Sequence, residues 1–156
     1  MTYIILNISD SDKHFDSAIK EYQKRLWKSL KIECIKPTRN GSVQQIIQGD
    51  TENILNIITK KSCLAGRQVW SYKKILLSKE WKTLNTDQFF DFCKKNNDIV
   101  FIIWWPYGLD EKLLEKNIDL KFSFGSVTLQ HWLAKLILLE QLYRITMISQ
   151  NRSYHY

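Results

Sequence analysis

Two kinds of segment alternate along this chain, and the alternation limits its possible folds more than any other feature. Short apolar runs bounded by polar residues predict buried strands, and longer stretches with apolar residues at helical spacing predict amphipathic helices. The expected strands occupy 2–9, 31–37, part of 68–78, 98–103 and 120–129. The expected helices occupy 9–30, 43–61, 87–97, 110–117 and 132–150. This order favours a single α/β domain over 1–156, with a mainly parallel sheet flanked by helices.

Two local signals refine the helix predictions. Thr86 stands before "DQFFDFCKKNN" and is expected to cap that helix. Gly49 and Asp50 are expected to interrupt the helix over 43–61, because glycine weakens a helix interior.

Charge and cysteine content restrict partners and compartment. The formal net charge of +7 suggests an anionic partner, most often nucleic acid, although solvated lysines give the same total. We expect no signal peptide and no membrane span, since no apolar run approaches the ~20 residues that a bilayer requires. Cys34, Cys63 and Cys93 lack metal-ligand spacing, so we expect reduced, structural thiols, a cytoplasmic location and no bound metal.

Parallel sheets bind ligands beyond the carboxyl ends of their strands. Three such strand exits are visible here: "LLSKEW" (76–81), "IIWWPYGL" (102–109) and "SFGSVTLQH" (123–131). They are the first candidates for a ligand site.

These exits and the C-terminal segment also carry a family resemblance. "FIIWWPYGL" is similar to a family pattern "IGGPxGL", and "LLSKEWKTL" to "LDExGKxL". "SFGSVTLQHWLAKLILLEQLYRI" has that family's Thr, His and "EQxYR" at the same spacing, and "NRSYHY" resembles its closing "GxPYH". The family is the ribosomal RNA large subunit methyltransferase H family, a small member of the SPOUT class of knotted methyltransferases.

The resemblance implies a fold and an activity. The fold would be the SPOUT fold with a C-terminal trefoil knot. The activity would be transfer of a methyl group from S-adenosylmethionine to N3 of a pseudouridine in a stem-loop of 23S rRNA. The enzyme would act on the assembled ribosome as a homodimer, without a membrane or a metal.

The resemblance also implies roles for individual residues. Those expected to hold the cofactor are Leu77, Trp104, Trp105, Gly108, Phe124, Gly125, Ser126, Val127, Thr128 and Leu129. The loop 124–129 would act largely through its backbone. Lys135 and Arg152 are expected to contact RNA. Gln130 and Tyr156 depart from the family pattern, which has proline and a basic residue at these positions.

The residues expected to carry the chemistry are His131, Arg144, Tyr154 and His155. The imino proton at N3 requires a base, for which His131 and His155 are both candidates. Tyr154 would position that base, and Arg144 would stabilise charge growing on the uracil oxygens.

The tryptophan content is unusual. The chain has 6 Trp and only 5 Gly, whereas ordinary usage predicts about 11 Gly. Trp104 and Trp105 stand at the family's Gly-Gly, Trp81 stands at another family glycine, and Trp27 stands where relatives often have glycine. Trp70 and Trp132 stand at more variable positions that tolerate a small residue. Our hypothesis is that the natural protein has glycine at all six positions, encoded by UGA. A divergent protein that carries tryptophan there is the alternative.

Two other functions stay open at this stage. The chain could be a catalytically inactive, basic RNA-binding dimer in which Trp104 and Trp105 block the cofactor pocket. It could also be an unrelated α/β protein whose C-terminal segment matches by chance.

Overall fold

A five-stranded parallel sheet forms the centre of the molecule. The computed structural model describes residues 1–9, 15–59, 63–64, 67–78, 83–104 and 107–152. The sheet consists of β1 (Thr2–Ile8), β2 (Leu30–Ile35), β5 (Lys73–Leu77), β6 (Asp98–Ile103) and β7 (Leu120–Phe122). Its spatial order is β2-β1-β6-β5-β7, and every pairing is parallel. The predicted α/β class is confirmed, while the knot and the single-domain organisation stay predictions.

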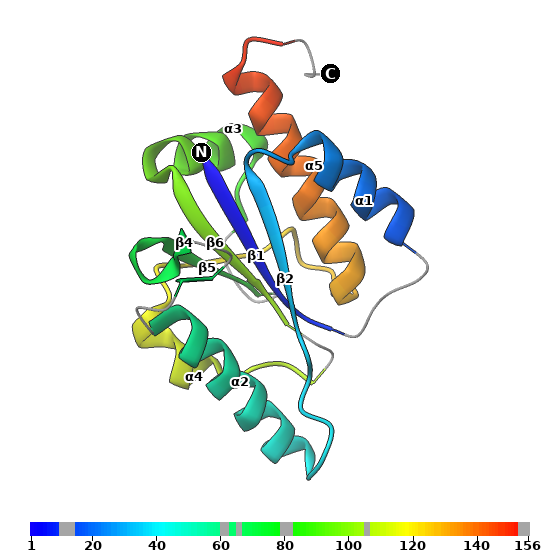
Figure 1. The fold of residues 1–156 in the computed structure, drawn as a ribbon, viewed down its shortest axis with the longest axis vertical. Helices are drawn as coiled ribbons and strands as arrows, with labels where there is room; N and C mark the ends of the chain where they lie inside the picture. The colour runs from blue at the N-terminus through cyan, green and yellow to red at the C-terminus, as the bar shows by residue number, and fades with distance from the viewer. Residues whose placement is uncertain (10–14, 60–62, 65–66, 79–82, 105–106, 153–156) are drawn as a thin grey trace.

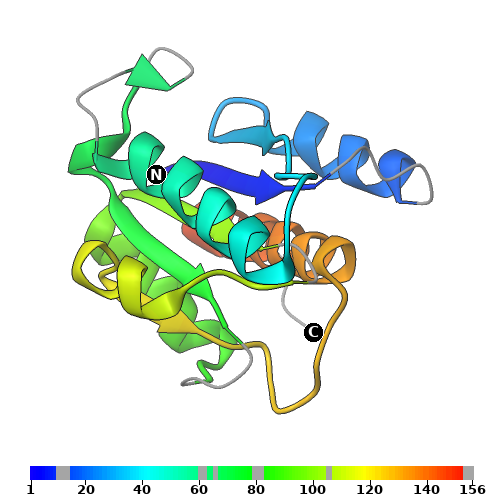
Figure 2. The same ribbon diagram turned by 90° about the horizontal axis from the view of Figure 1, so that it is seen from below.

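Helices cover both faces of this sheet. Figures 1 and 2 show α1 and α5 packed together on one face, with α2 and α4 on the other. The helices are α1 (Asp16–Arg25), α2 (Val43–Thr59), α3 (Thr86–Asn96), α4 (Glu111–Leu114) and α5 (His131–Ser149). Short 3-10 turns, η1 (Val69–Ser71) and η2 (Glu115–Asn117), and a small antiparallel pair, β3 (Cys63–Leu64) with β4 (Arg67–Gln68), complete the described elements.

Alternate residues of the strands divide the core into two layers. On β1, Tyr3 and Ile5 pack with the side that includes α1, α3 and α5, whereas Ile4 and Leu6 pack with the side that includes α2 and α4. All four side chains are fully buried. Burial on both faces is what a parallel sheet requires, and it explains why these strands read as continuous apolar runs.

The strand over 120–129 is shorter than predicted. β7 ends at Phe122, and Ser123 makes only an isolated bridge to Thr83. The Ser123 hydroxyl then donates to the Gly125 carbonyl at 2.7 Å, and Gly125 has φ +145°. The chain therefore turns away from the sheet, and 124–130 form a loop beyond the strand ends.

The predicted interruption at Gly49 is wrong, because α2 is continuous. A Cβ at Gly49 would lie 2.8 Å from Thr38 Oγ1, so this glycine permits close approach of the preceding loop. The neighbouring Asp50 is buried and accepts a hydrogen bond from the Thr38 N–H at 2.7 Å. Gly49 and Asp50 therefore anchor the preceding loop to α2, and they do not end the helix.

The predicted cap of α3 is displaced by one residue. Asn85, not Thr86, is the N-cap, and its side chain accepts from the Gln88 N–H at 2.8 Å. The Gln88 side chain in turn accepts a hydrogen bond from the Asn85 N–H at 3.0 Å, which completes a capping box. Thr86 instead donates its hydroxyl to Gln141 on α5 at 3.3 Å.

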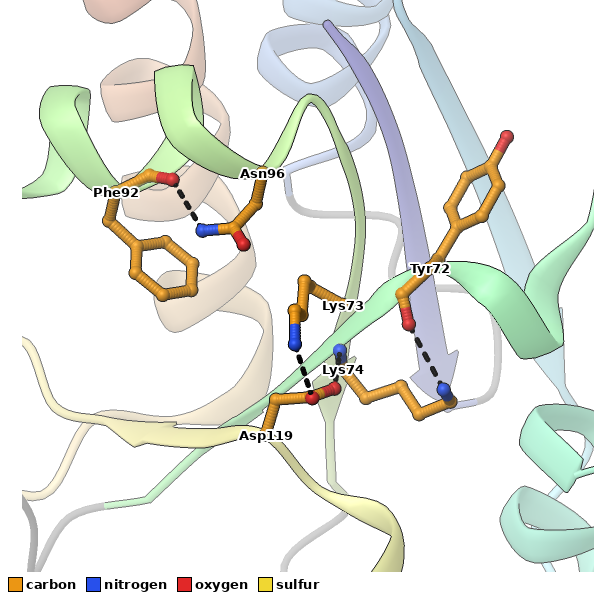
Figure 3. A network of polar contacts seen from close by, with 6 residues as sticks. All are labelled: Tyr72, Lys73, Lys74, Phe92, Asn96 and Asp119. Carbon is orange, nitrogen blue, oxygen red and sulfur yellow. Dashed lines mark hydrogen bonds and ion pairs between the residues drawn. The ribbon is translucent and has the colours of Figure 1, made fainter.

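An acidic side chain joins two strands at the amino end of the sheet (Figure 3). Asp119 accepts from the Lys73 ammonium at 2.9 Å and from the Lys74 N–H at 2.8 Å. Partial burial alone would raise the pKa of Asp119, but these two hydrogen bonds outweigh it and hold the pKa below its usual 3.8. The contact fixes the start of β7 against β5.

Candidate active site

A cavity of about 460 Å³ lies at the carboxyl edge of the sheet. Its floor comes from the last residues of three neighbouring strands, Leu77, Ile103 and Phe122, and the beginning of α5 closes one side. The loop 124–130 completes the wall. The cavity therefore joins the three strand exits that the sequence singled out.

Most predicted cofactor residues of the described chain meet in this cavity. The predicted residues that line it are Leu77, Trp104, Phe124, Val127, Thr128, Leu129 and His131. Gly108, Gly125 and Ser126 do not line it, although Gly125 and Ser126 lie in the same loop as their lining neighbours. Trp105, Tyr154 and His155 fall outside the described residues.

Several lining residues were not assigned to the site from the sequence. Ser78, Ile103, Phe122, Ser123 and Ala134 belong to this group. Three of them end or follow a strand beside a predicted residue, so the register of the sheet is the signal that identifies them. That register depends on pairings between distant segments, which the sequence pattern does not reveal.

The loop after β7 is largely exposed and begins with a turn that Ser123 holds. Val127 is 67% exposed, and Ser126 and Thr128 are also exposed. Gly125 has space where a Cβ would stand, but its φ of +145° disfavours any other residue. Ser123, which is buried, both donates to the Gly125 carbonyl and accepts from its N–H. The side chain of Ser123 thus holds the turn that opens the loop.

Trp104 forms part of the cavity wall but does not fill the cavity. Its side chain is half-buried and packs against the core layer that contains Ile4 and Leu6. The volume of about 460 Å³ remains with this indole present. Trp104, Trp27 and Trp132 all lack the positive φ that would require glycine. Side-chain space, rather than backbone conformation, is therefore what glycine would change at these three positions.

The two described catalytic candidates lie far apart. His131 begins α5 and lines the cavity, whereas Arg144 lies thirteen residues further along the same helix. At 1.5 Å per residue the separation is about 20 Å. Arg144 is paired with Glu140, with 2.6 Å between Nη2 and Oε1. Within one chain, His131 and Arg144 therefore lie toward opposite ends of α5.

The two predicted RNA-contacting residues differ in exposure. Arg152 is exposed beyond the end of α5, where its N–H donates to the Met147 carbonyl at 3.0 Å. Lys135 is only 6% exposed and lies on the face of α5 that carries the buried Leu138 and Leu139. Such burial does not fit a phosphate contact at the protein surface.

The described residues were also considered as possible metal ligands and as possible membrane spans. Nowhere among them do three or more His, Cys, Asp or Glu side chains gather as a metal ion would need. The helices in this part of the chain are too short or too polar to cross a membrane.

Comparison with known proteins decides the family. Residues 1–155 match the family model described as "Predicted SPOUT methyltransferase". The chain belongs to the SPOUT methyltransferase family. It is also similar to proteins named "Ribosomal RNA large subunit methyltransferase H", so the family resemblance read from its motifs is confirmed.

Three of these relatives illustrate how far the similarity extends. The protein of Thermotoga neapolitana is 32% identical to this SPOUT methyltransferase over 151 residues, which is 93% of each chain. That of Thermotoga maritima is 32% identical over 155 residues, covering 96% of this chain and 95% of the relative. That of Streptococcus agalactiae serotype III is 33% identical over 157 residues, or 92% of each chain.

Proposed function

We propose that this chain methylates large-subunit ribosomal RNA, transferring the methyl group of S-adenosylmethionine to N3 of a pseudouridine in 23S rRNA. The substrate would be a stem-loop of the assembled ribosome, and the protein would act in the cytoplasm. One observation carries the proposal. Three of the four segments that match the family motifs, although distant in sequence, contribute residues to one cavity at the carboxyl edge of the sheet.

The residues of the cavity fit a nucleoside-sized cofactor. A volume of about 460 Å³ lies within the usual range for ligand sites, roughly 300–1,000 Å³. The floor is apolar, as suits an adenine ring. Leu77 and the backbone of 124–129 would hold the cofactor. Bound there, S-adenosylmethionine would supply a methyl group activated by its sulfonium.

The protein's own contribution is alignment and proton removal. Holding the nucleobase in line with the methyl group is worth several kcal/mol. His131 lies on the cavity wall and is one candidate for the base that accepts the N3 proton. His155, with Tyr154, is the other. An unstacked nucleoside would enter from a loop held by phosphate contacts of Arg152 and surface lysines.

The distance along α5 supports a homodimer. Because Arg144 lies about 20 Å from His131 in one chain, a site in which His131 is the base would take its arginine from a second copy. A two-fold arrangement of two copies would allow such an exchange.

The experiment is methyl transfer from radiolabelled S-adenosylmethionine to ribosomes, free large subunits and naked 23S rRNA. We expect label in the assembled ribosome. If His131 is the base, His131→Ala should lower the rate about 10²–10⁴-fold, whereas Gln48→Ala, on the exposed face of α2, should not. If neither His131→Ala nor His155→Ala slowed the reaction, the histidine assignment would be wrong. Absence of label from all three RNAs would contradict the proposed function.

A second function is favoured by the position of Trp104 on the cavity wall. Together with Trp105 it would make the chain an inactive, basic RNA-binding dimer. Calorimetry with S-adenosylmethionine separates the two functions. Binding by the chain or by its Trp104→Gly/Trp105→Gly variant supports the enzyme, and binding by neither supports the RNA-binding dimer.

A further inference from the structure

Three polar side chains from three elements meet at the rim of the cavity. Ser78 follows β5, is 5% exposed and lines the cavity. Glu111 begins α4, and Lys121 lies on β7. The Ser78 hydroxyl donates to Glu111 Oε1 at 3.1 Å, and Lys121 Nζ lies 2.8 Å from Glu111 Oε2. Ser78 lies in the strand exit 76–81 that the sequence singled out, whereas Glu111 and Lys121 were not assigned to any site.

The carboxylate fixes the direction of the Ser78 hydroxyl. A serine hydroxyl has one hydrogen to donate and two lone pairs that accept, whereas an ionised carboxylate only accepts. Since the single hydrogen of Ser78 is directed at Glu111, the oxygen is left as an acceptor. Ser78 lines the cavity, so it can offer those lone pairs to a ligand.

The Lys121 ammonium helps to keep Glu111 the acceptor and Ser78 the donor in this hydrogen bond. The side chain of Lys121 is 13% exposed and that of Glu111 is 33% exposed, so solvent screens this ion pair less than a surface pair. A carboxylate held by an ammonium at one oxygen keeps its other oxygen available to Ser78. Lys121 therefore occupies one oxygen of Glu111 and leaves the other to Ser78.

Neighbouring hydrogen bonds fix the backbone at Ser78 and beside Glu111. The Ser78 N–H donates to the Phe122 carbonyl at 2.9 Å, which continues the pairing of β5 with β7. The Asp110 side chain caps α4 by accepting from the Lys112 and Leu113 N–H groups. The Asp110 N–H donates to the hydroxyl of the fully buried Thr51 at 2.9 Å. Ser78 and Glu111 are thus fixed before any ligand arrives.

We propose that Ser78 Oγ accepts a hydrogen bond from an O–H or N–H donor of the bound cofactor, and that Glu111, with Lys121, is the positioning pair that keeps Ser78 an acceptor. The inference rests on the proposed function, because it assigns this hydroxyl to the same cavity. S-Adenosylmethionine carries donors of this kind on its ribose, its adenine and its amino-acid end. A ligand that offers only acceptors at this point would be rejected.

Calorimetric titration of the full chain with S-adenosylmethionine tests the proposal. Ser78→Ala should weaken binding about tenfold, the usual worth of one such hydrogen bond. Glu111→Gln should weaken it less, because an amide can also donate to Ser78. In the Ser78→Ala background, Glu111→Gln should have no further effect. Glu115→Gln, a glutamate one turn further along the chain, is the matched control and should bind like the wild type.

Titration with 5′-methylthioadenosine, which lacks the amino-acid end, then identifies the donor. An equal loss for both ligands in Ser78→Ala assigns it to the nucleoside. A loss confined to S-adenosylmethionine assigns it to the amino-acid end, and either result supports the proposal.

Two results would overturn the inference while leaving the proposed function intact. One is equal affinity of the wild type and Ser78→Ala. The other is a loss in Glu111→Gln that is as large without Ser78 as with it, which would indicate a purely structural role for Glu111. A wild-type chain, and a Trp104→Gly/Trp105→Gly variant, that bind no cofactor at all would instead contradict the proposed function itself.

Discussion

At the scale of single residues, the surroundings of the tryptophans bear on the hypothesis that these positions are glycine in the natural protein. Trp27 is 70% exposed, and Trp132 stacks on Phe15 with ring centroids 4.1 Å apart. Trp104 borders the cavity. These three indoles have different surroundings, so no single packing requirement explains them. The hypothesis that UGA was read as tryptophan would explain all six positions by one cause.

We predict that the coding DNA has UGA at the six tryptophan positions, and that the natural protein carries glycine there. Reading those codons is the measurement. A UGG codon at Trp104 or Trp105 would contradict the hypothesis and leave tryptophan as the natural residue.

Cys34 and Cys93 should differ sharply in reactivity. Burial raises the pKa of the Cys93 thiol to about 12, whereas Cys34 is exposed on β2. Because the thiolate is the reactive form, iodoacetamide at pH 8 should modify Cys34 rapidly and Cys93 only after unfolding. Peptide mass spectrometry with and without urea measures this. Equal modification of both thiols in the folded protein would contradict the burial of Cys93.

At the scale of elements, the sequence predicted the type of each main helix and strand well, but not all of their ends. β6 was predicted over its full length, because a run such as "DIVFII" is buried on both faces. The end of β7 was missed, since it depends on the Ser123–Gly125 turn. Gly49 was misread because its close neighbour, Thr38, belongs to another segment. A local turn therefore decided the end of β7, whereas a contact between distant segments decided the role of Gly49.

The cap of α3 gives a direct test at this scale. Asn85→Ala should lower the free energy of unfolding by about 1 kcal/mol, because it leaves the Gln88 N–H without its capping partner. Thr86→Ala, which replaces the cap that the sequence suggested, should lower the free energy of unfolding by less. Urea denaturation of both variants makes the comparison. A larger loss for Thr86→Ala would mean that the helix begins one residue later than described.

The Asp119 contact between β5 and β7 predicts a pH dependence. Its folded pKa lies below the unfolded value, so its contribution is present above about pH 4 and is lost as pH falls through the folded pKa. The side chain of Asp119 is 34% exposed, so we expect Asp119→Asn to cost less than about 1 kcal/mol at pH 7.

The difference between the wild type and Asp119→Asn should shrink as the pH is lowered from 5 to 3. Denaturation at several pH values measures it, with Asp98→Asn, an exposed carboxylate at the same edge of the sheet, as the control. A difference that stayed constant across this range would rule out the proposed electrostatic origin.

At the scale of the whole molecule, the parallel sheet brings distant segments to one edge and thereby forms the site. The sequence indicated that the three strand exits would meet there, because parallel strands share their carboxyl edge. It did not reveal that Glu111 meets Ser78 across 33 residues of sequence. Strand order and side-chain direction, which a motif does not encode, determine this contact.

The central claim is that this cavity serves methylation of a pseudouridine at N3. The most direct measurement is mass spectrometry of nucleosides from 23S rRNA, after assembled ribosomes lacking the modification are incubated with the protein and S-adenosylmethionine. The chain, or its form with glycine at the six tryptophan positions, should convert one pseudouridine per ribosome to 3-methylpseudouridine. An unchanged nucleoside profile with both forms, or a methyl group on another nucleoside, would contradict it.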